Sequence, residues 1–346
     1  MDLVLDISSS IAFWRQCYPT NRTPKDRLLT AHNAPTPSSE LACNDANIRD
    51  AISRFSDYSL LAADNRCHTV AFSEQNRRDS SIHSVHVWNG RIPTGSFFEF
   101  HDGVFLESPE CMFMRAATIL DLVSLIAFGD ELCGYFSFDP RDKRGFRKRL
   151  KPLTSKAQLE RYLTCAQGCR GLKRAKVALP FVIENCASPM EVFDEMTMCL
   201  PYRYGGYGIP RPEMNLLVPL NERAMRIAKR EKCYLDMGWR RKSLDVEHHG
   251  KLDHSSVEDR ASDRARVNGL KEMGYEVIEL TYDQIDDLIA YEHIICRISR
   301  ILGKRIHKQY LGATSERIAL RKGLSAWNAS SGTILQKRDR YERSGS

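Results

Sequence analysis

The chain has 346 residues, of which 42% are hydrophobic and 27% are charged. This length and apolar content predict a globular protein that is long enough for two domains and apolar enough to form a substantial core. Its 51 Lys and Arg exceed its 44 Asp and Glu, so the net charge of +7 mildly favours polyanionic partners without requiring one.

The eleven cysteines are scattered and odd in number, and a chain of this size does not need disulfide bonds, so they indicate a reducing compartment. Cys165 and Cys169 lie close together but lack a His or a second Cys pair at zinc-finger spacing, so no zinc site is expected there. Residues 1–16 carry acids where a secretory signal has cations, and no stretch approaches the roughly eighteen apolar residues of a membrane span. We therefore expect a cytoplasmic protein with no membrane partner.

Residues 1–110 predict an α+β region. The segment LVLDISSSIAFWRQ, residues 3–16, predicts a short strand followed by a Ser-capped helix. Residues 19–45 are rich in Pro, Ser and Thr and predict a loop with some helix at its end. Between residues 68 and 108, short apolar runs punctuated by Gly, Asn and Pro predict β-strands.

Residues 111–184 predict a helical connecting region. Apolar residues at helical spacing over 111–134 predict one buried helix, and two further helical stretches follow over 155–167 and 171–185. The run RDKRGFRKRLK, residues 141–151, holds seven cations and one acid. We expect it to be a solvated loop, with contact to phosphate as the alternative.

Residues 185–300 predict a domain in which helices and strands alternate. A helix begins with Ser188 as its N-cap and Pro189 at its first position, and the Gly- and Pro-rich residues 205–215 predict a loop. The later elements are a strand over 234–239, a turn with the sequence RRKS, a returning strand over 244–250, a helix over 255–273 that ends at Gly274, and a strand over 275–281. The polar residues 301–346 predict an extension that is partly disordered and frays from about residue 310.

Acidic residues stand in the two strands that flank the RRKS turn, although carboxylates are disfavoured in strands. Side chains alternate along a strand, so Asp245, Glu247 and His249 project from one face. If the two strands pair with their apolar faces together, Asp236 lies beside Glu247. Two carboxylates this close repel each other unless a cation lies between them, and Mg²⁺ prefers such oxygen ligands. The pattern predicts a metal site; the alternative is the exposed polar face of an antiparallel hairpin.

Further motifs surround these acids in a fixed order. SPxE opens a helix, an acid stands in a strand, a hairpin follows, VE comes shortly before a Gly, and then come His254, a helix with DxxRxxxL, and GYEVIELT. Over roughly residues 185–290 this order resembles the Vsr-like, DUF559-type domains of bacteria, which belong to the PD-(D/E)XK nuclease superfamily. The resemblance implies a restriction-endonuclease-like central mixed sheet flanked by helices, and hydrolysis of DNA phosphodiester bonds with Mg²⁺ or Mn²⁺.

Carried over by position, the resemblance also assigns roles to three acids. It implies that Asp236 and Glu247 bind the metal ion and that Glu191 orients metal-bound water. Glu191 has an alternative role, because Ser188 and Glu191 fit a capping box in which the Glu accepts a hydrogen bond from a backbone N–H at the start of the helix.

The sequence departs from the family at residue 249. Related domains read VEYDG and the wider superfamily carries a Lys at this position, whereas this chain reads VEHHG. His249 is therefore a candidate general base or phosphate contact, with a degraded site as the alternative. His254 is the second candidate proton acceptor, with a loop histidine as the alternative. Lys251 is a candidate substitute for the Lys, although it starts roughly 7 Å further along the strand.

Cations on the helix predicted over 255–273 are candidate DNA contacts. Arg260 and Arg264 lie one turn apart. Asp263 and Arg266 are spaced for a surface ion pair worth a few tenths of a kcal/mol. The resemblance implies instead that this Asp and Arg support the fold of the site or a phosphate. The alternative for all of them is a charged face in contact with solvent.

Residues 100–184 resemble, more faintly, the region that precedes the nuclease domain in AbiEi-related, toxin–antitoxin-associated chains, which implies a DNA-associated or regulatory front half. We therefore expect a Mg²⁺-dependent DNA endonuclease that acts in defence, repair or a mobile-element context. One alternative is a nuclease fold that has lost catalysis and acts as a DNA-binding or antitoxin-like regulator. Another is a structural partner of a toxin or mobile-element protein.

Overall fold

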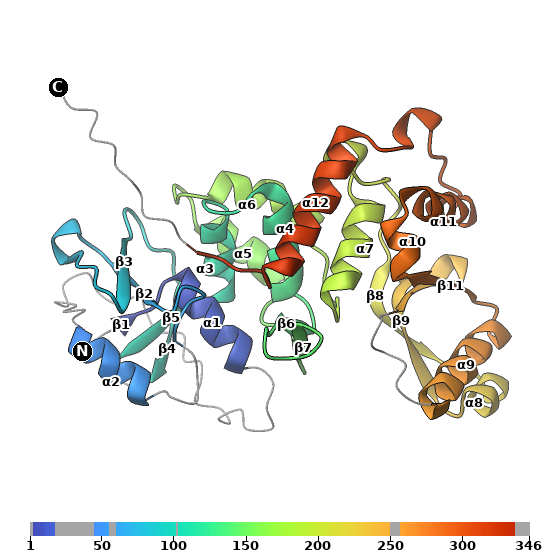
Figure 1. The fold of residues 1–346 in the computed structure, drawn as a ribbon, viewed down its shortest axis with the longest axis horizontal. Helices are drawn as coiled ribbons and strands as arrows, with labels where there is room; N and C mark the ends of the chain where they lie inside the picture. Colours follow the sequence, from blue (N-terminus) through green and yellow to red (C-terminus); the bar gives the residue numbers. More distant parts are fainter. Residues whose placement is uncertain (1–2, 18–44, 55–59, 102, 250–256, 336–346) are drawn as a thin grey trace.

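The computed structural model describes residues 3–17, 45–54, 60–101, 103–249 and 257–335. The protein is an elongated body with small sheets at its N-terminal end, a group of helices in the middle, and a four-stranded sheet at the other end (Figure 1). The expectation of a mixed α/β, or α+β, protein is confirmed at this level.

Two small sheets form the N-terminal end. In one sheet, β5 (Val104–Glu107) pairs in parallel with β1 (Leu3–Val4) and antiparallel with β4 (Phe97–His101). In the other, β2 (Cys67–Ala71) and β3 (His83–Val87) are parallel. A single bridge between Leu5 and Thr69 links the two sheets.

Two helices cover the N-terminal sheets. They are α1 (Ile7–Cys17) and α2 (Asp45–Arg54). Phe13 of α1 and Ile48 of α2 are fully buried in one cluster with Leu3 and Leu106. The helix predicted after the first strand is therefore present, and it packs through its apolar side.

The middle of the chain is mostly helical, as predicted, but its first buried segment is divided into two helices. These are α3 (Pro109–Ala116) and α4 (Leu122–Leu132). The Asp121 side chain accepts a hydrogen bond from the backbone N–H of Ser124 and so starts a new helix. The prediction of one helix over 111–134 is wrong because this internal cap was not recognised.

The basic residues 141–151 are part of a β-hairpin rather than a simple loop. Strand β6 (Phe136–Phe138) pairs antiparallel with β7 (Phe146–Lys148). Phe146 packs edge-on against the buried Phe136, with ring centroids 6.3 Å apart. This aromatic contact fixes a strand that the surrounding charges concealed. Helices α5 (Lys156–Cys165) and α6 (Leu172–Ala178) follow.

The C-terminal sheet is mixed and has the strand order β11-β10-β9-β8. Strand β9 (Lys232–Trp239) pairs antiparallel with both β8 (Glu213–Pro219) and β10 (Leu244–His249), and β10 pairs in parallel with β11 (Glu276–Thr281). The three predicted strands are confirmed. Strand β8 was missed because it begins within the Gly- and Pro-rich segment that was assigned to a loop.

Helices surround this sheet and connect its strands. Ser188 caps the first of them by accepting a hydrogen bond from the backbone N–H of Glu191, as predicted. No helix among the described residues combines the length and apolar content needed to cross a bilayer. The helices are α7 (Pro189–Cys199), α8 (Glu222–Ala228), α9 (Val257–Glu272), α10 (Tyr282–Asp286), α11 (Leu288–Ile301) and α12 (Ser315–Ala329). Short 3₁₀ helices are η1 (Glu74–Asn76), η2 (Leu179–Phe181), η3 (Tyr202–Tyr204), η4 (Arg240–Lys242) and η5 (Lys308–Tyr310).

Helix α12 returns to the middle of the molecule and packs between α4 and α7 (Figure 1). Leu320, Leu324 and Trp327 are buried there, although most neighbouring positions on the helix are polar. The expectation that the chain frays from about residue 310 is therefore wrong for residues 315–329. The apolar side chains recur at helical spacing, which outweighs the polar average composition.

One hydrophobic cluster joins much of the molecule. It contains Ile7 and Trp14 of α1, Phe128 of α4, Val246 of β10 and Ile334 near the end of the described chain. The four predicted regions thus contribute to a shared core. The C-terminal sheet is held in place by α7 and α12 on this core, and these elements position the acids predicted for catalysis.

Candidate functional site

Three of the acids predicted for catalysis gather where α7 meets strands β9 and β10. We call Glu191, Asp236 and Glu247 the carboxylate cluster. Burial raises the pKa of Asp236, and the negative charge of Glu247 raises it further. Burial and then the charge of Asp236 raise the pKa of Glu191. Asp236 therefore lies close enough to each of the other two acids for their charges to interact.

Asp236 lies on β9 opposite Asn215 of β8, within the continuous register of the two strands. Met214 pairs with Met237 and Leu216 pairs with Leu235, on either side of Asn215 and Asp236. Asn215 has a φ of 49°, in the left-handed region that Asn tolerates better than most residues. The backbone N–H of His248 donates to Asp236 Oδ2 at 3.2 Å.

Glu191 combines the two roles that the sequence left open. Its Oε2 accepts hydrogen bonds from the backbone N–H of Ala187 at 2.7 Å and from Asn215 Nδ2 at 3.2 Å. Ser188 Oγ also donates to Glu191 Oε1 at 3.1 Å. The side chain thus binds groups at the start of α7, which supports the helix end. It also faces the charge of Asp236 and belongs to the carboxylate cluster.

Glu247 is bound by an arginine. Arg266 of α9 donates from Nη1 to Oε1 at 2.5 Å and from Nη2 to Oε2 at 2.6 Å. The two side chains are only 7% and 13% exposed, so this is a largely buried, bidentate ion pair. From the sequence, Arg266 was expected to pair with Asp263 at the surface or, by the resemblance, to support the site or a phosphate; its partner Glu247 was not predicted. Both Glu247 oxygens are engaged by a cation that the protein itself supplies.

Asp245 lies two residues before Glu247 on β10 and is fully buried. Its carboxyl group lies within interaction range of the Glu247 side chain. Burial and the charge of Glu247 raise its pKa far above the ordinary value. Asp245 is therefore protonated at neutral pH, and it contributes little negative charge to the site.

The next residue, His248, has a partner on α7. Its Nδ1 lies 2.8 Å from Asp194 Oδ2, and both side chains are buried. The sequence analysis gave neither residue a role. Asp194 follows Glu191 by almost one helical turn, and this spacing was the available signal. The pair ties β10 to the helix that carries Glu191.

The predicted proton acceptors and DNA contacts lie at the end of β10, in α9 or outside the described residues. His254 and Lys251 lie outside the described residues. His249 ends β10, where its backbone pairs with Thr281. Arg260 lies in α9, and Arg264 of the same helix is exposed.

A lysine missed by the sequence analysis lies near the carboxylate cluster. Lys148 is exposed at the end of β7, within the basic run of residues 141–151. Burial dominates the pKa values of Glu191 and Asp236, but the positive charge of Lys148 acts on both in the opposite direction. The basic run was expected to be solvated, with phosphate contact as the alternative, and its hairpin brings the charge of one of its cations within electrostatic range of the acids.

Comparisons of the chain with known protein families, curated proteins and solved structures find no match. What the site can do follows from its own residues. Glu191 and Asp236 are oxygen ligands whose repulsion a divalent cation such as Mg²⁺ would relieve, so they fit such an ion. Glu247 fits the same ion only if Arg266 gives up its two hydrogen bonds.

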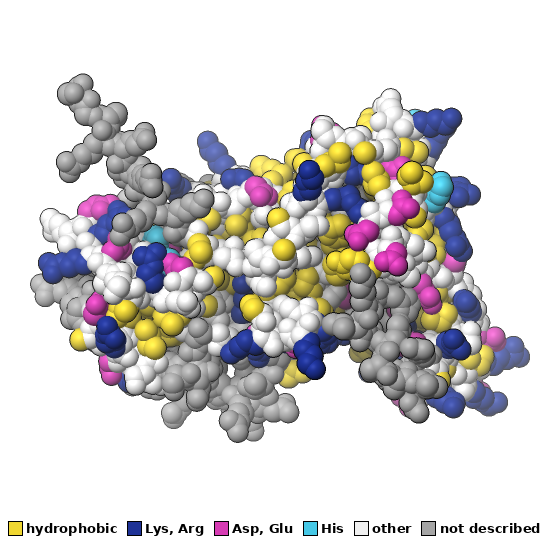
Figure 2. Space-filling model, in the orientation of Figure 1, with side chains coloured by type: hydrophobic (Ala, Val, Ile, Leu, Met, Phe, Trp, Pro, Cys, Tyr) yellow, Lys and Arg dark blue, Asp and Glu magenta, His cyan; other side chains and the backbone are white. Residues whose placement is uncertain are grey.

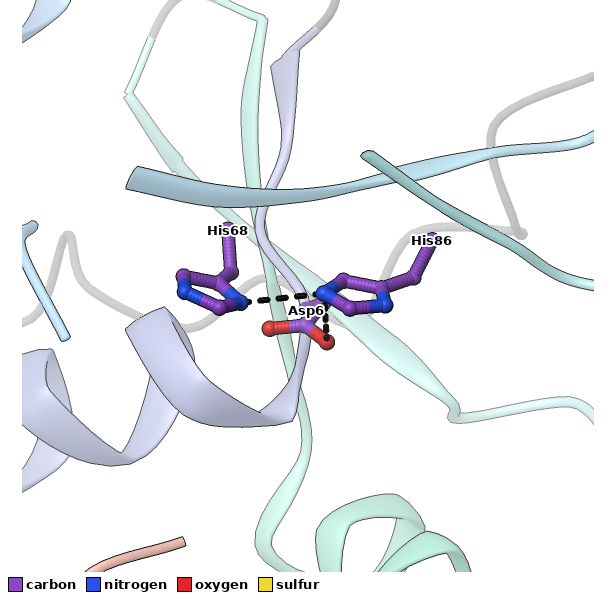
Figure 3. Close-up of side chains that lie close together, drawn as sticks. All are labelled: Asp6, His68 and His86. Atoms are coloured by element: carbon purple, nitrogen blue, oxygen red, sulfur yellow. Dashed lines mark hydrogen bonds and ion pairs between the residues drawn. The ribbon is translucent and has the colours of Figure 1, made fainter. Parts of the chain in front are cut away.

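Another group of side chains converges more closely at the far end of the molecule. Asp6, His68 and His86 each offer one ligand atom, and these atoms all lie within 4.8 Å of one another (Figure 3). All three residues are buried. This group can hold a metal ion. No local sequence pattern indicates this group, because the three residues come from separate strands and loops.

Proposed function

We propose that residues 185–300 form a restriction-endonuclease-like domain of the Vsr-like, DUF559 type, and that the chain is a Mg²⁺- or Mn²⁺-dependent DNA endonuclease. The observation that carries this proposal is the meeting of Glu191 and Asp236, two buried or half-buried acids with raised pKa values that a cation would stabilise in their charged form. The mixed sheet and the helix that precedes it agree with the fold that the resemblance implies.

Each residue of the site has a role in this proposal. When bound, the divalent ion would polarise the scissile phosphate and lower the pKa of a water molecule. Glu191 and Asp236 would hold the ion. Lys148 would offset negative charge on the phosphate. His249 or His254 would accept the proton of the attacking water.

The distribution of surface cations supports a nucleic-acid substrate. Lys and Arg side chains gather over the β6–β7 hairpin and along α8 and α11 on the face drawn in Figure 2. Phosphate contacts of this kind provide most of the sequence-independent affinity for DNA. The exposed cations include Arg141, Lys143, Arg144, Lys148 and Lys151 around the hairpin, and Arg297, Arg300, Lys304 and Arg305 near the end of α11.

The direct test is cleavage by the purified full chain. We expect nicking or cleavage of DNA in Mg²⁺ or Mn²⁺ at pH 7 to 8, and a loss of at least about 100-fold when EDTA removes the ion. The substrates are duplex, nicked, mismatched and single-stranded DNA. No cleavage of any of them with either ion would contradict the endonuclease proposal.

The ion pair between Glu247 and Arg266 favours a second candidate function, a DNA-binding or antitoxin-like regulator that keeps the nuclease fold. In this case the arginine permanently takes the place of a cation beside Glu247. Such a protein would shift DNA in a gel without any metal requirement. Its affinity would fall steeply with salt, as expected for phosphate contacts.

Replacing Lys148 with Ala tests whether this side chain acts on the phosphate. We expect cleavage to fall by about 10- to 100-fold because a positive charge beside the transferring group is lost. Stability should not change, because the side chain is exposed. Lys143→Ala is the matched control, since Lys143 is exposed on the same hairpin. Equal activities of the two variants would show that Lys148 has no role in cleavage.

A further inference from the structure

Three ligand-type side chains meet between the two N-terminal sheets. Asp6 directly follows the bridge residue Leu5 after β1, His68 lies in β2, and His86 lies in β3. His68 pairs with Ser84 and Val70 pairs with His86 in the parallel register, so both imidazoles project from the same face of the β2–β3 sheet. Figure 3 shows the Asp6 carboxyl group beside the two rings. The exposures of Asp6, His68 and His86 are 0%, 1% and 6%.

Hydrogen bonds alone do not satisfy this group. His68 Nδ1 lies 2.9 Å from His86 Nε2, and His86 Nε2 lies 3.7 Å from Asp6 Oδ2, which is too long for a hydrogen bond. If His86 donates its Nε2 proton to His68, Asp6 Oδ2 receives none. If His68 donates instead, the bare Nε2 of His86 faces the carboxylate. In either arrangement a fully buried carboxylate oxygen has no donor, and Asp6 Oδ2 has no hydrogen-bond partner in the structure.

A nearby arginine, Arg115, is the protein cation that could have paired with Asp6, but its guanidinium has other partners. Arg115 is close enough to Asp6 for the two charges to influence each other. Its guanidinium, however, is bound to the buried Glu107 and stacks over the Trp88 ring. The unpartnered oxygen of Asp6 therefore points toward the imidazoles rather than toward a protein cation.

Other groups hold the three side chains in orientation. Asp64 lies 3.0 and 3.1 Å from His68 Nε2, which leaves Nδ1 to face the group. The backbone N–H of Ser8 donates to Asp6 Oδ1 at 2.8 Å, and the backbone N–H of Asp6 donates to the carbonyl oxygen of His68. A carboxylate behind a histidine ligand is the usual arrangement around protein-bound metal ions, because it fixes the ring and its tautomer.

We propose that Asp6, His68 and His86 bind one divalent transition-metal ion of the zinc class. Imidazole nitrogen favours Zn²⁺, Co²⁺, Ni²⁺ or Fe²⁺ over Mg²⁺. In a tetrahedral site with bonds of 2.0–2.1 Å, neighbouring ligand atoms are separated by about 3.3 Å. Two of the three separations, 2.9 and 3.7 Å, lie on either side of that value, and all three ligand atoms lie within 4.8 Å of one another, so side-chain rotations would admit the ion.

The ion would join the two N-terminal sheets. Its ligands belong to β2, β3 and the segment after β1, where the Leu5–Thr69 bridge and the hydrogen bond from the Asp6 N–H to the His68 carbonyl oxygen already link the two sheets. The burial of all three ligands indicates a structural role rather than substrate contact. This inference does not depend on the proposed nuclease activity, because the carboxylate cluster lies at the other end of the molecule (Figure 1).

The test uses the full chain, stripped with a chelator and titrated with Zn²⁺ or Co²⁺. We expect the chain to bind one equivalent at this site, with the visible ligand-field absorption of a Co²⁺ ion coordinated by nitrogen and oxygen. The metal-loaded protein should also have a higher unfolding temperature than the stripped protein. Failure of the Asp236→Asn chain, which lacks a ligand of the carboxylate cluster, to bind either ion would overturn the proposal, whatever the other variants do.

Variants then locate the site. His86→Gln and Asp6→Asn should lower the affinity at least about 100-fold, since each removes a ligand. His83→Gln is the matched control: His83 is equally buried on the same strand, but its Nδ1 bonds Asp45 and Ser80. It should bind one equivalent, as should Asp236→Asn. Unchanged affinity in both ligand variants would overturn the assignment.

Discussion

Asp236→Asn is expected to lower metal-dependent DNA cleavage by roughly 1,000-fold without unfolding the protein. A bound divalent ion stabilises the transition state of phosphoryl transfer by several kcal/mol. Each ~1.4 kcal/mol of that stabilisation corresponds to about a tenfold change in rate, so losing a ligand of the ion lowers the rate by several tenfold steps. Asn keeps the shape of the side chain and can still accept the hydrogen bond from the His248 backbone N–H. It lacks the negative charge that the ion requires.

Asp245→Asn is the control for this variant. Asp245 is buried on the neighbouring strand and is protonated at neutral pH, so an amide of the same shape changes its charge little. We expect Asp245→Asn to retain cleavage within about threefold. Full activity in Asp236→Asn, or equal losses in both variants, would contradict the assignment of Asp236 as a metal ligand.

The stability of Asp236→Asn should also depend less on pH than that of the wild type. Burial and the charge of Glu247 raise the Asp236 pKa from 3.8 to about 7. A carboxyl group with a raised folded-state pKa stabilises the fold below its unfolded pKa, and that contribution is lost as the pH rises through the folded value. The metal-free wild type should therefore lose stability between about pH 4 and pH 7, and Mg²⁺ should restore more of it at pH 8 than at pH 5. Thermal unfolding at the two pH values, with and without Mg²⁺, measures this difference.

Local sequence patterns were sufficient for the elements that hold the carboxylate cluster. Ser188 and Pro189 predicted the start of α7, and the alternation of polar and apolar residues around the RRKS turn predicted β9 and β10. Pairing of those strands then brought Asp236 near Glu247. These features depend on neighbours in sequence or on one hairpin, where periodicity and capping chemistry are informative.

Features that depend on distant contacts could not be predicted in the same way. Arg266 was assigned to a charged surface because its helix is polar, yet the fold directs it to a buried Glu247. The charge of Lys148 acts on the acids only because the β6–β7 hairpin, distant in sequence, brings it within electrostatic range of α7 and β9. The group of Asp6, His68 and His86 forms only when two separate sheets meet, and no spacing in the sequence encodes that meeting.

Arg266→Gln is expected to destabilise the protein by about 3–5 kcal/mol, because it leaves the Glu247 carboxylate buried without its partner. Denaturant unfolding at pH 7 measures the loss. Arg264→Gln is the matched control two residues away on the same helix; Arg264 is exposed, so its replacement should change stability by no more than about 0.5 kcal/mol. Glu247→Gln combined with Arg266→Gln should recover part of the loss, because the unpaired charge is then absent.

The response of Arg266→Gln to Mg²⁺ separates the two proposed functions. If the site belongs to an endonuclease, removal of the guanidinium frees both Glu247 oxygens, and Mg²⁺ should restore more stability to this variant than to the wild type, because the ion replaces the lost positive charge. DNA phosphates would then draw Arg266 away from Glu247 in the wild-type complex and open the same ligand. If the protein is a regulator in which arginine has replaced the ion, Mg²⁺ should leave the variant as unstable as before. A variant that is not destabilised at all would contradict both, because the buried ion pair would then not hold α9 against β10.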